Sequence, residues 1–153
     1  MGSAQEAPVR EILRILDEGD FRPNLARVTA MFTEDAWYQV GVPARQAIQG
    51  RDAIAAELTR QSSDYRDCVC EILRVVSDDR YVVTERIDHV TMNHNGVRVH
   101  NPLLAIFEVN DDGLIVDWRE YWDAMSVARQ IGVSADEVPY YMGITEADAE
   151  VAP

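Results

Sequence analysis

Four long β-rich segments in the second half of the chain constrain its fold more than any other feature. They span approximately residues 66–76, 80–92, 97–109 and 114–122. Short polar connections separate them, and two of these contain Asn95–Gly96 and Asp112–Gly113, dipeptides that favour tight hairpin turns. Long strands joined by such short connections predict an antiparallel meander.

The first half of the chain has the pattern of helices. Apolar residues at helical spacing predict one helix that starts near Pro8 and a second that starts near Pro23 and buries Phe32. A third helix is expected after Gly50, and a last short helix is expected over residues 124–131.

One more strand is expected over residues 36–42, because Thr33–Asp35 would end the preceding helix and Pro43 would end the strand. Helices followed by a meander of strands predict an α+β fold. The expected architecture is a cone, a curved mixed or antiparallel sheet whose N-terminal helices close an internal pocket. The outer face of such a sheet is left exposed, so a homodimer that forms through it is expected.

The length and charge of the chain limit its organisation and its partners. The 153 residues predict one domain over residues 1–133, followed by an acidic tail over residues 134–153. The net charge of −13 repels phosphate backbones and anionic membrane surfaces. We therefore expect neither nucleic acid nor a membrane as a partner. The charge favours a neutral or cationic small molecule, and a mostly apolar pocket of the expected kind suits a small hydrophobic one.

No targeting, metal or cofactor signal stands out in the sequence. The N-terminus lacks a basic start and an apolar core, and Cys68 and Cys70 read as packing residues in a reducing compartment, so a cytoplasmic protein is expected. The three histidines show no metal-binding spacing, and no G-x-S-x-G, H-E-x-x-H, G-x-G-x-x-G or P-loop pattern occurs. We expect no metal and no cofactor.

The stretch Ile115–Asp123 places a carboxylate among aromatic side chains. If it is a strand, Glu120 shares a face with Leu114, Val116, Trp118 and Trp122. Burial of that face would raise the pKa of Glu120 and suit it to acid–base chemistry. In the alternative arrangement the face is reversed, Glu120 lies in water and the tryptophans pack a dimer interface.

Other polar residues could meet Glu120 in the pocket. Arg86 and Asp88 lie two apart and so share one face of a strand, although the same spacing fits a solvated ion pair. Tyr38 could hold a water molecule or a substrate oxygen, or could be a half-buried packing residue. Asn101 shares a face with Leu103 and could reach the pocket, or could be a turn residue beside the proline that follows it.

Three motifs carry a family resemblance. T-E-R-I-D on one strand, W-R-E-Y-W-D on a later strand and E-D-A-W-Y-Q before the loop together resemble the limonene-1,2-epoxide hydrolase family. That family belongs to the wider SnoaL-like, nuclear-transport-factor-2-like cone folds. The resemblance runs from about Val9 to Gln130.

The resemblance implies a cofactor-independent epoxide hydrolase. In that family an Asp–Arg–Asp set opens an epoxide in one step without a covalent intermediate. Carried over, Glu120 is the base that deprotonates water, Asp88 is the acid that protonates the epoxide oxygen, Arg86 bridges them and Tyr38 holds the water. Around these four catalytic candidates, five binding candidates are expected: Val40, Asn101, Leu103, Trp118 and Trp122.

Two departures from the family pattern keep other functions open. The family has aspartate where this chain has Glu120, and a water-holding asparagine where this chain has Val40. With one water contact missing, the same acid–base pair could serve a SnoaL-like cyclase or isomerase that moves protons, closes a ring or opens an epoxide from within. A third alternative is a non-catalytic cone that binds a hydrophobic ligand.

Overall fold

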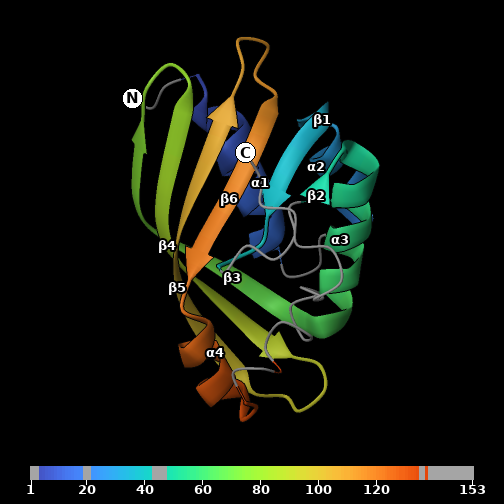
Figure 1. Ribbon diagram of the computed structural model, residues 1–153, viewed down its shortest axis with the longest axis vertical. Helices are drawn as coiled ribbons and strands as arrows, with labels where there is room; N and C mark the ends of the chain where they lie inside the picture. The colour runs from blue at the N-terminus through green and yellow to red at the C-terminus, as the bar shows by residue number, and fades with distance from the viewer. Residues whose placement is uncertain (1–3, 19–21, 43–47, 135–136, 138–153) are drawn as a thin grey trace.

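The computed structural model has the predicted α+β architecture, a curved mixed sheet of six strands with four helices (Figure 1). It describes residues 4–18, 22–42, 48–134 and 137. The helices are α1 (Glu6–Asp17), α2 (Leu25–Thr29), α3 (Arg51–Asp64) and α4 (Ala124–Ile131), with a short 3-10 turn over Arg22–Asn24. The strands are β1 (Phe32–Gln39), β2 (Ile48–Gln49), β3 (Tyr65–Ser77), β4 (Tyr81–Met92), β5 (Arg98–Val109) and β6 (Ile115–Trp122). Strand β1 ends at Gln39, three residues before the predicted end, and nearly all of the predicted tail lies outside the described residues.

The four predicted β-rich segments form the antiparallel meander β3–β4–β5–β6, and the meander prediction is confirmed. The full strand order is β2-β1-β6-β5-β4-β3, so β1 and β2 extend the sheet beyond β6. Strand β1 runs parallel to β6, which makes the sheet mixed. The side chains that point to the helices therefore come from strands far apart in the sequence.

The sequence-based placement of β1 is wrong by several residues. The strand begins at Phe32, which was assigned to the buried side of a helix, and it includes Thr33–Asp35, which were expected to separate helix from strand. Phe32 pairs with Ile115 of β6, and the Ile115 N–H donates to the carbonyl of Met31. This parallel pairing between distant segments fixes the start of β1, and local sequence gives no sign of it.

Helix α1 lies behind β6 and β5 in the view of Figure 1, α3 lies beside β1 and β2, and α4 lies at the lower end of the long strands. Helix α1 buries the apolar stripe that predicted it, including Val9, Ile12 and Leu13. These residues join Phe32 and Phe107 in one core between the helices and the sheet. Of the helices in the described part of the chain, none has both the length and the apolar character that a membrane span needs.

A β-bulge in β6 decides which of its side chains face inward. Glu108 pairs with Asp117 while Val109 pairs with Ile115, so Val116 is an extra residue on β6. Strict alternation predicted Val116 on the face of Glu120; instead Ile115 is fully buried and Val116 is only half-buried. From Trp118 onward the alternation is as predicted.

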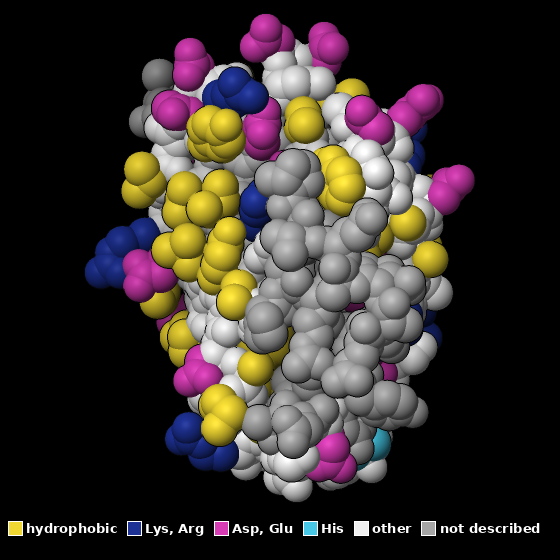
Figure 2. Space-filling view, in the orientation of Figure 1, with side chains coloured by type: hydrophobic (Ala, Val, Ile, Leu, Met, Phe, Trp, Pro, Cys, Tyr) yellow, Lys and Arg dark blue, Asp and Glu magenta, His cyan; other side chains and the backbone are white. Residues whose placement is uncertain are grey.

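The outer face of the sheet carries apolar side chains. Figure 2 shows hydrophobic side chains gathered over the strands β4 to β6 on the face turned away from α1. Leu73, Leu104 and Tyr121 are among the exposed large hydrophobic residues, and all three line a shallow groove on this face.

Helix α4 closes one end of the structure and depends on a cap at its start. The Asp123 carboxylate accepts hydrogen bonds from the backbone N–H groups of Met125 at 2.9 Å and Ser126 at 3.1 Å. Asp123→Ala should lower the free energy of unfolding by about 1 kcal/mol, because these two N–H groups lose their acceptor. Urea denaturation measures the loss, and Asp111→Ala, at an exposed turn position, is the control and should change stability much less. Equal losses in the two variants would contradict the capping role.

Candidate active site

Strand register brings the predicted polar residues together in neighbouring rows across the inner face of the sheet. The first row is Thr84, Ala105 and Glu120; the second is Arg86, Leu103 and Trp122; the third is Asp88 and Asn101. Arg86 therefore lies one row from each carboxylate. The two acids come to a single site because β5 holds β4 and β6 in this register.

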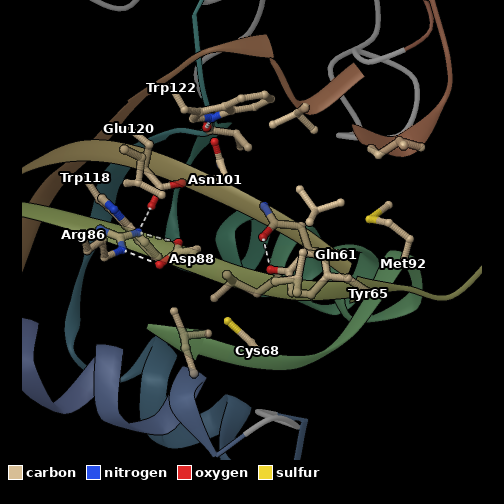
Figure 3. A pocket seen from close by; sticks show the side chains of 18 of the residues that line it. Gln61, Tyr65, Cys68, Arg86, Asp88, Met92, Asn101, Trp118, Glu120 and Trp122 are labelled. Atoms are coloured by element: carbon tan, nitrogen blue, oxygen red, sulfur yellow. Dashed lines mark hydrogen bonds and ion pairs between the residues drawn. The ribbon is translucent and has the colours of Figure 1, made fainter. Parts of the chain in front are cut away.

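Arg86 bridges the two carboxylates. It is 1% exposed, and it bonds Asp88 through two nitrogens, Nε to Oδ1 at 2.9 Å and Nη2 to Oδ2 at 3.2 Å. The same Nη2 donates to Glu120 Oε1 (Figure 3). Outside the cavity lining, Nη1 donates to Thr84 Oγ1 at 3.1 Å. Burial alone would lower the pKa of Arg86, but the two adjacent carboxylates outweigh it and the net shift is upward, so the guanidinium is charged.

Glu120 is a buried acid that changes its protonation state near neutral pH. Burial raises its pKa to about 7, with Arg86 opposing the rise and the charge of Asp88 adding to it. Its carboxylate faces the cavity, so the arrangement with Glu120 in water and the tryptophans outside is not the one adopted. A group with this pKa can give or take a proton at neutral pH.

Tyr38 connects Glu120 to helix α3. Its hydroxyl donates to Glu120 Oε2 at 3.5 Å, and Gln61 Nε2 donates to the Tyr38 oxygen at 3.3 Å. The Gln61 carbonyl in turn accepts from the Tyr65 hydroxyl at 3.1 Å. Burial keeps the pKa of Tyr38 well above its ordinary value, so it remains a neutral donor. Because Gln61 supplies a donor to the oxygen of Tyr38, the phenolic proton is directed toward Glu120.

Gln61 and Tyr65 are site residues that the sequence analysis missed. Both line the cavity, and Gln61 is buried on α3 in line with Ile54 and Leu58. A polar residue that continues an apolar stripe at helical spacing is the signal that could have identified Gln61. Tyr65 lies where α3 passes into β3, a boundary that spacing alone does not locate.

All four catalytic candidates and all five binding candidates line one cavity between the sheet and the helices. The Trp118 ring stacks on Tyr38 with centroids 4.4 Å apart and on Phe107 at 5.3 Å. Most of the remaining wall is apolar, and Val127 and Ile131 of α4 contribute to it. Among the residues that the structure describes, no group of three or more histidine, cysteine or acidic side chains has the arrangement of a metal site.

Trp122 and Val40 form the wall next to Glu120. The Trp122 indole N–H donates to the Val40 carbonyl at 2.7 Å. The ring lies so close to Gly41 that a β-carbon there would be 2.7 Å from Nε1, so only glycine fits. The Val40 side chain is buried and lines the cavity, and it offers no hydrogen bond.

The raised pKa of Glu120 links stability to pH. The native state holds this proton more tightly than the unfolded chain, so the stabilisation is complete below about pH 4.5 and is lost as the pH rises through about 7. Glu120→Gln removes this titration, so the variant should not lose this stability as the pH rises. Between about pH 5.5 and pH 8 the unfolding free energy of the wild type should therefore fall by roughly 2 kcal/mol relative to that of the variant.

Urea denaturation at several pH values tests this. Glu85→Gln is the matched control, because Glu85 is 42% exposed and surface carboxylates of this kind contribute little to stability. The Glu85 variant should follow the wild type across the range. A Glu120→Gln protein whose stability also runs parallel to the wild type would contradict a buried, titrating Glu120.

The comparisons with known proteins support the fold. The model of the SnoaL-like domain family matches residues 9–118. An epoxide hydrolase of the limonene-1,2-epoxide hydrolase type from M. tuberculosis is 26% identical, with a TM-score of 0.68, over 84% of this chain and 92% of that one. SalBIII is an epoxide hydrolase/cyclase-like enzyme with a role in pyran ring formation in polyether salinomycin. It is 21% identical, with a TM-score of 0.66, over 78% of this chain and 90% of SalBIII. A nuclear-transport-factor-2-like protein from Burkholderia pseudomallei has a TM-score of 0.72 at 16% identity, over 85% of this chain and 98% of that one.

Proposed function

This chain belongs to the SnoaL-like domain family, and we propose that it is an epoxide hydrolase that adds water to a small hydrophobic epoxide to give a vicinal diol. One observation carries the proposal: a buried arginine bridges two carboxyl groups in an apolar cavity, and one of the two has a pKa of about 7. Burial and the nearby charge of Asp88 both raise the pKa of Glu120, so Glu120 can exchange a proton near neutral pH. Such a pair offers a base and an acid at once.

The reaction needs one proton taken and one given. In the proposed mechanism Glu120 acts as the base in its ionised form, and Asp88 acts as the acid. Glu120 removes a proton from a water molecule, whose oxygen attacks an epoxide carbon, while Asp88 protonates the oxygen of the breaking C–O bond. Water and epoxide thus combine to a diol, and the proton returns from Glu120 to Asp88 before the next turnover.

The rows of the sheet suit this geometry. Glu120 and Asp88 lie on either side of Arg86, one row away in each direction. An epoxide lying over Arg86 would have the attacking water on its Glu120 side and its leaving oxygen on its Asp88 side. Attack and departure then occur from opposite sides of the carbon. Arg86 remains charged throughout and stabilises the negative charge that develops on either oxygen.

Both acids should be required for turnover. Asp88→Asn and Glu120→Gln each remove a proton-transfer group with little change in volume, so each should lower kcat by about 10²-fold or more. Activity is measured as diol formed from cyclohexene oxide in ¹⁸O-labelled water, where one labelled oxygen per diol identifies solvent as the nucleophile. Asp117→Asn, on β6 but outside the cavity, is the control and should retain activity. Near-normal turnover by either cavity variant would exclude the assigned mechanism.

A cyclase or isomerase is the second candidate, and the specific observation in its favour is Val40. An apolar side chain beside Glu120 leaves the attacking water with fewer contacts than a polar one would. The similarity to SalBIII, an enzyme described as both hydrolase-like and cyclase-like, supports keeping this candidate. The same acid and base would then serve a nucleophile within the substrate.

Val40→Asn tests hydrolase against cyclase. If the site uses water but holds it weakly, one added hydrogen bond of about 1 kcal/mol should raise diol formation about fivefold. Leucine has nearly the shape of asparagine but lacks the amide, so Val40→Leu is the control and should not raise diol formation. If the wild type forms no labelled diol from any epoxide, yet closes or rearranges a ring in a Glu120-dependent way, the cyclase takes the place of the hydrolase.

The homodimer also remains a prediction. It is supported by the apolar groove on the outer face, which Leu73, Leu104 and Tyr121 help to line. A second copy that covers this groove would remove the exposed apolar surface from water without touching the cavity on the other face.

A further inference from the structure

One amide in the cavity has no hydrogen bond to any residue that the structure describes. The other strongly polar side chains of the wall are already engaged with one another: Tyr38, Gln61, Tyr65, Arg86, Asp88 and Glu120. Asn101 lines the same cavity with its side chain half-buried, and it takes no part in that network. The indole nitrogen of Trp118 also lacks a partner among the described residues, but the atom is fully buried.

Asn101 lies beside the proposed acid. It is the cross-strand partner of Asp88, so their β-carbons are about 5 Å apart on the inner face. The surfaces near it are apolar, with Val99 on its own strand and Val127 and Ile131 on α4. A purely hydrocarbon ligand at this end would strip water from the amide and give it nothing in return, which costs binding.

Asn101 cannot replace the missing water ligand at Val40. Val40 follows Gln39, the parallel partner of Arg119, and so lies next to Glu120. Asn101 lies in the row of Asp88, two rows from Glu120 and on the far side of Arg86. Its amide is therefore placed to meet the substrate on the side of the leaving oxygen, and not to hold the attacking water.

We propose that Asn101 makes this site selective for epoxides that carry a hydroxyl or carbonyl oxygen on a carbon next to the epoxide ring. This inference rests on the proposed epoxide hydrolysis and names its substrate class. With the epoxide oxygen at Asp88, an oxygen on the adjacent carbon reaches the neighbouring amide. A carboxamide can donate to either group and can also accept from a hydroxyl.

A matched pair of substrates tests the inference. The epoxy alcohol 2,3-epoxycyclohexan-1-ol and the epoxide 1,2-epoxy-3-methylcyclohexane differ by a hydroxyl in place of a methyl group of similar size. Wild-type protein should show a kcat/KM for the alcohol at least about tenfold higher, because only the alcohol pairs with the amide. Asn101→Leu keeps the shape of the side chain, and should lower the ratio of kcat/KM for the alcohol to kcat/KM for the methyl compound about tenfold. A ratio near one in wild type, or an unchanged ratio in the variant, overturns the inference.

A binding measurement separates this inference from the proposed chemistry. In the Glu120→Gln background, the fluorescence of the cavity tryptophans Trp118 and Trp122 reports binding of both compounds without turnover. Tighter binding of the alcohol by about tenfold, lost on adding Asn101→Leu, supports the role of Asn101 even if the wild type hydrolyses neither compound, in which case only the hydrolase proposal fails. Equal affinities, or no binding of either compound, overturn the role of Asn101 whatever the activity.

Discussion

The buried guanidinium of Arg86 is the interaction on which the rest of the site depends. A charge with 1% exposure is tolerated only if it is paired and hydrogen-bonded, and each of the three guanidinium nitrogens of Arg86 donates to a carboxylate or to the hydroxyl of Thr84. These partners come from β4 itself and from β6, two strands away. Correct folding of the sheet and assembly of the acid–base pair are therefore the same event. A slip of one residue in the register of β5 would keep Thr84 and Asp88 beside Arg86, because all three lie on β4, but it would separate Arg86 from Glu120.

The same burial that makes Glu120 useful also costs stability. Its pKa of about 7 means that folding disfavours its ionised form, which is the form the proposed base needs. The stacked rings of Tyr38 and Trp118 supply much of the apolar surroundings, and the Tyr38 hydroxyl partly compensates by donating to the carboxylate. The core beneath the site, with its fully buried aliphatic and aromatic side chains, stabilises the fold against this local cost.

Local signals in the sequence were sufficient for the meander and for which residues share a face of a strand, but they left open which of the two faces turns inward. Hairpin dipeptides bounded the strands, and period-two alternation placed Arg86 and Asp88 together and Glu120 between two tryptophans. Features that depend on distant pairing could not be predicted. The parallel contact with β6 starts β1 at Phe32, and the bulge at Val116 changes which side chain turns inward. Gln61 was missed because its role depends on Tyr38, a strand residue that α3 meets only after folding.

The distribution of polar groups along the cavity bears on which reaction the site favours. The water side, near Glu120, has an apolar neighbour in Val40, whereas the acid side, near Asp88, has the uncommitted amide of Asn101. An internal nucleophile would have to reach the epoxide carbon from the side of Glu120, because that is where the base lies. A substrate oxygen bound by Asn101 is held on the opposite side, where it anchors the molecule and cannot attack. If Asn101 binds the only oxygen substituent of the substrate, the space beside Glu120 is left to water, and hydrolysis is favoured over ring closure.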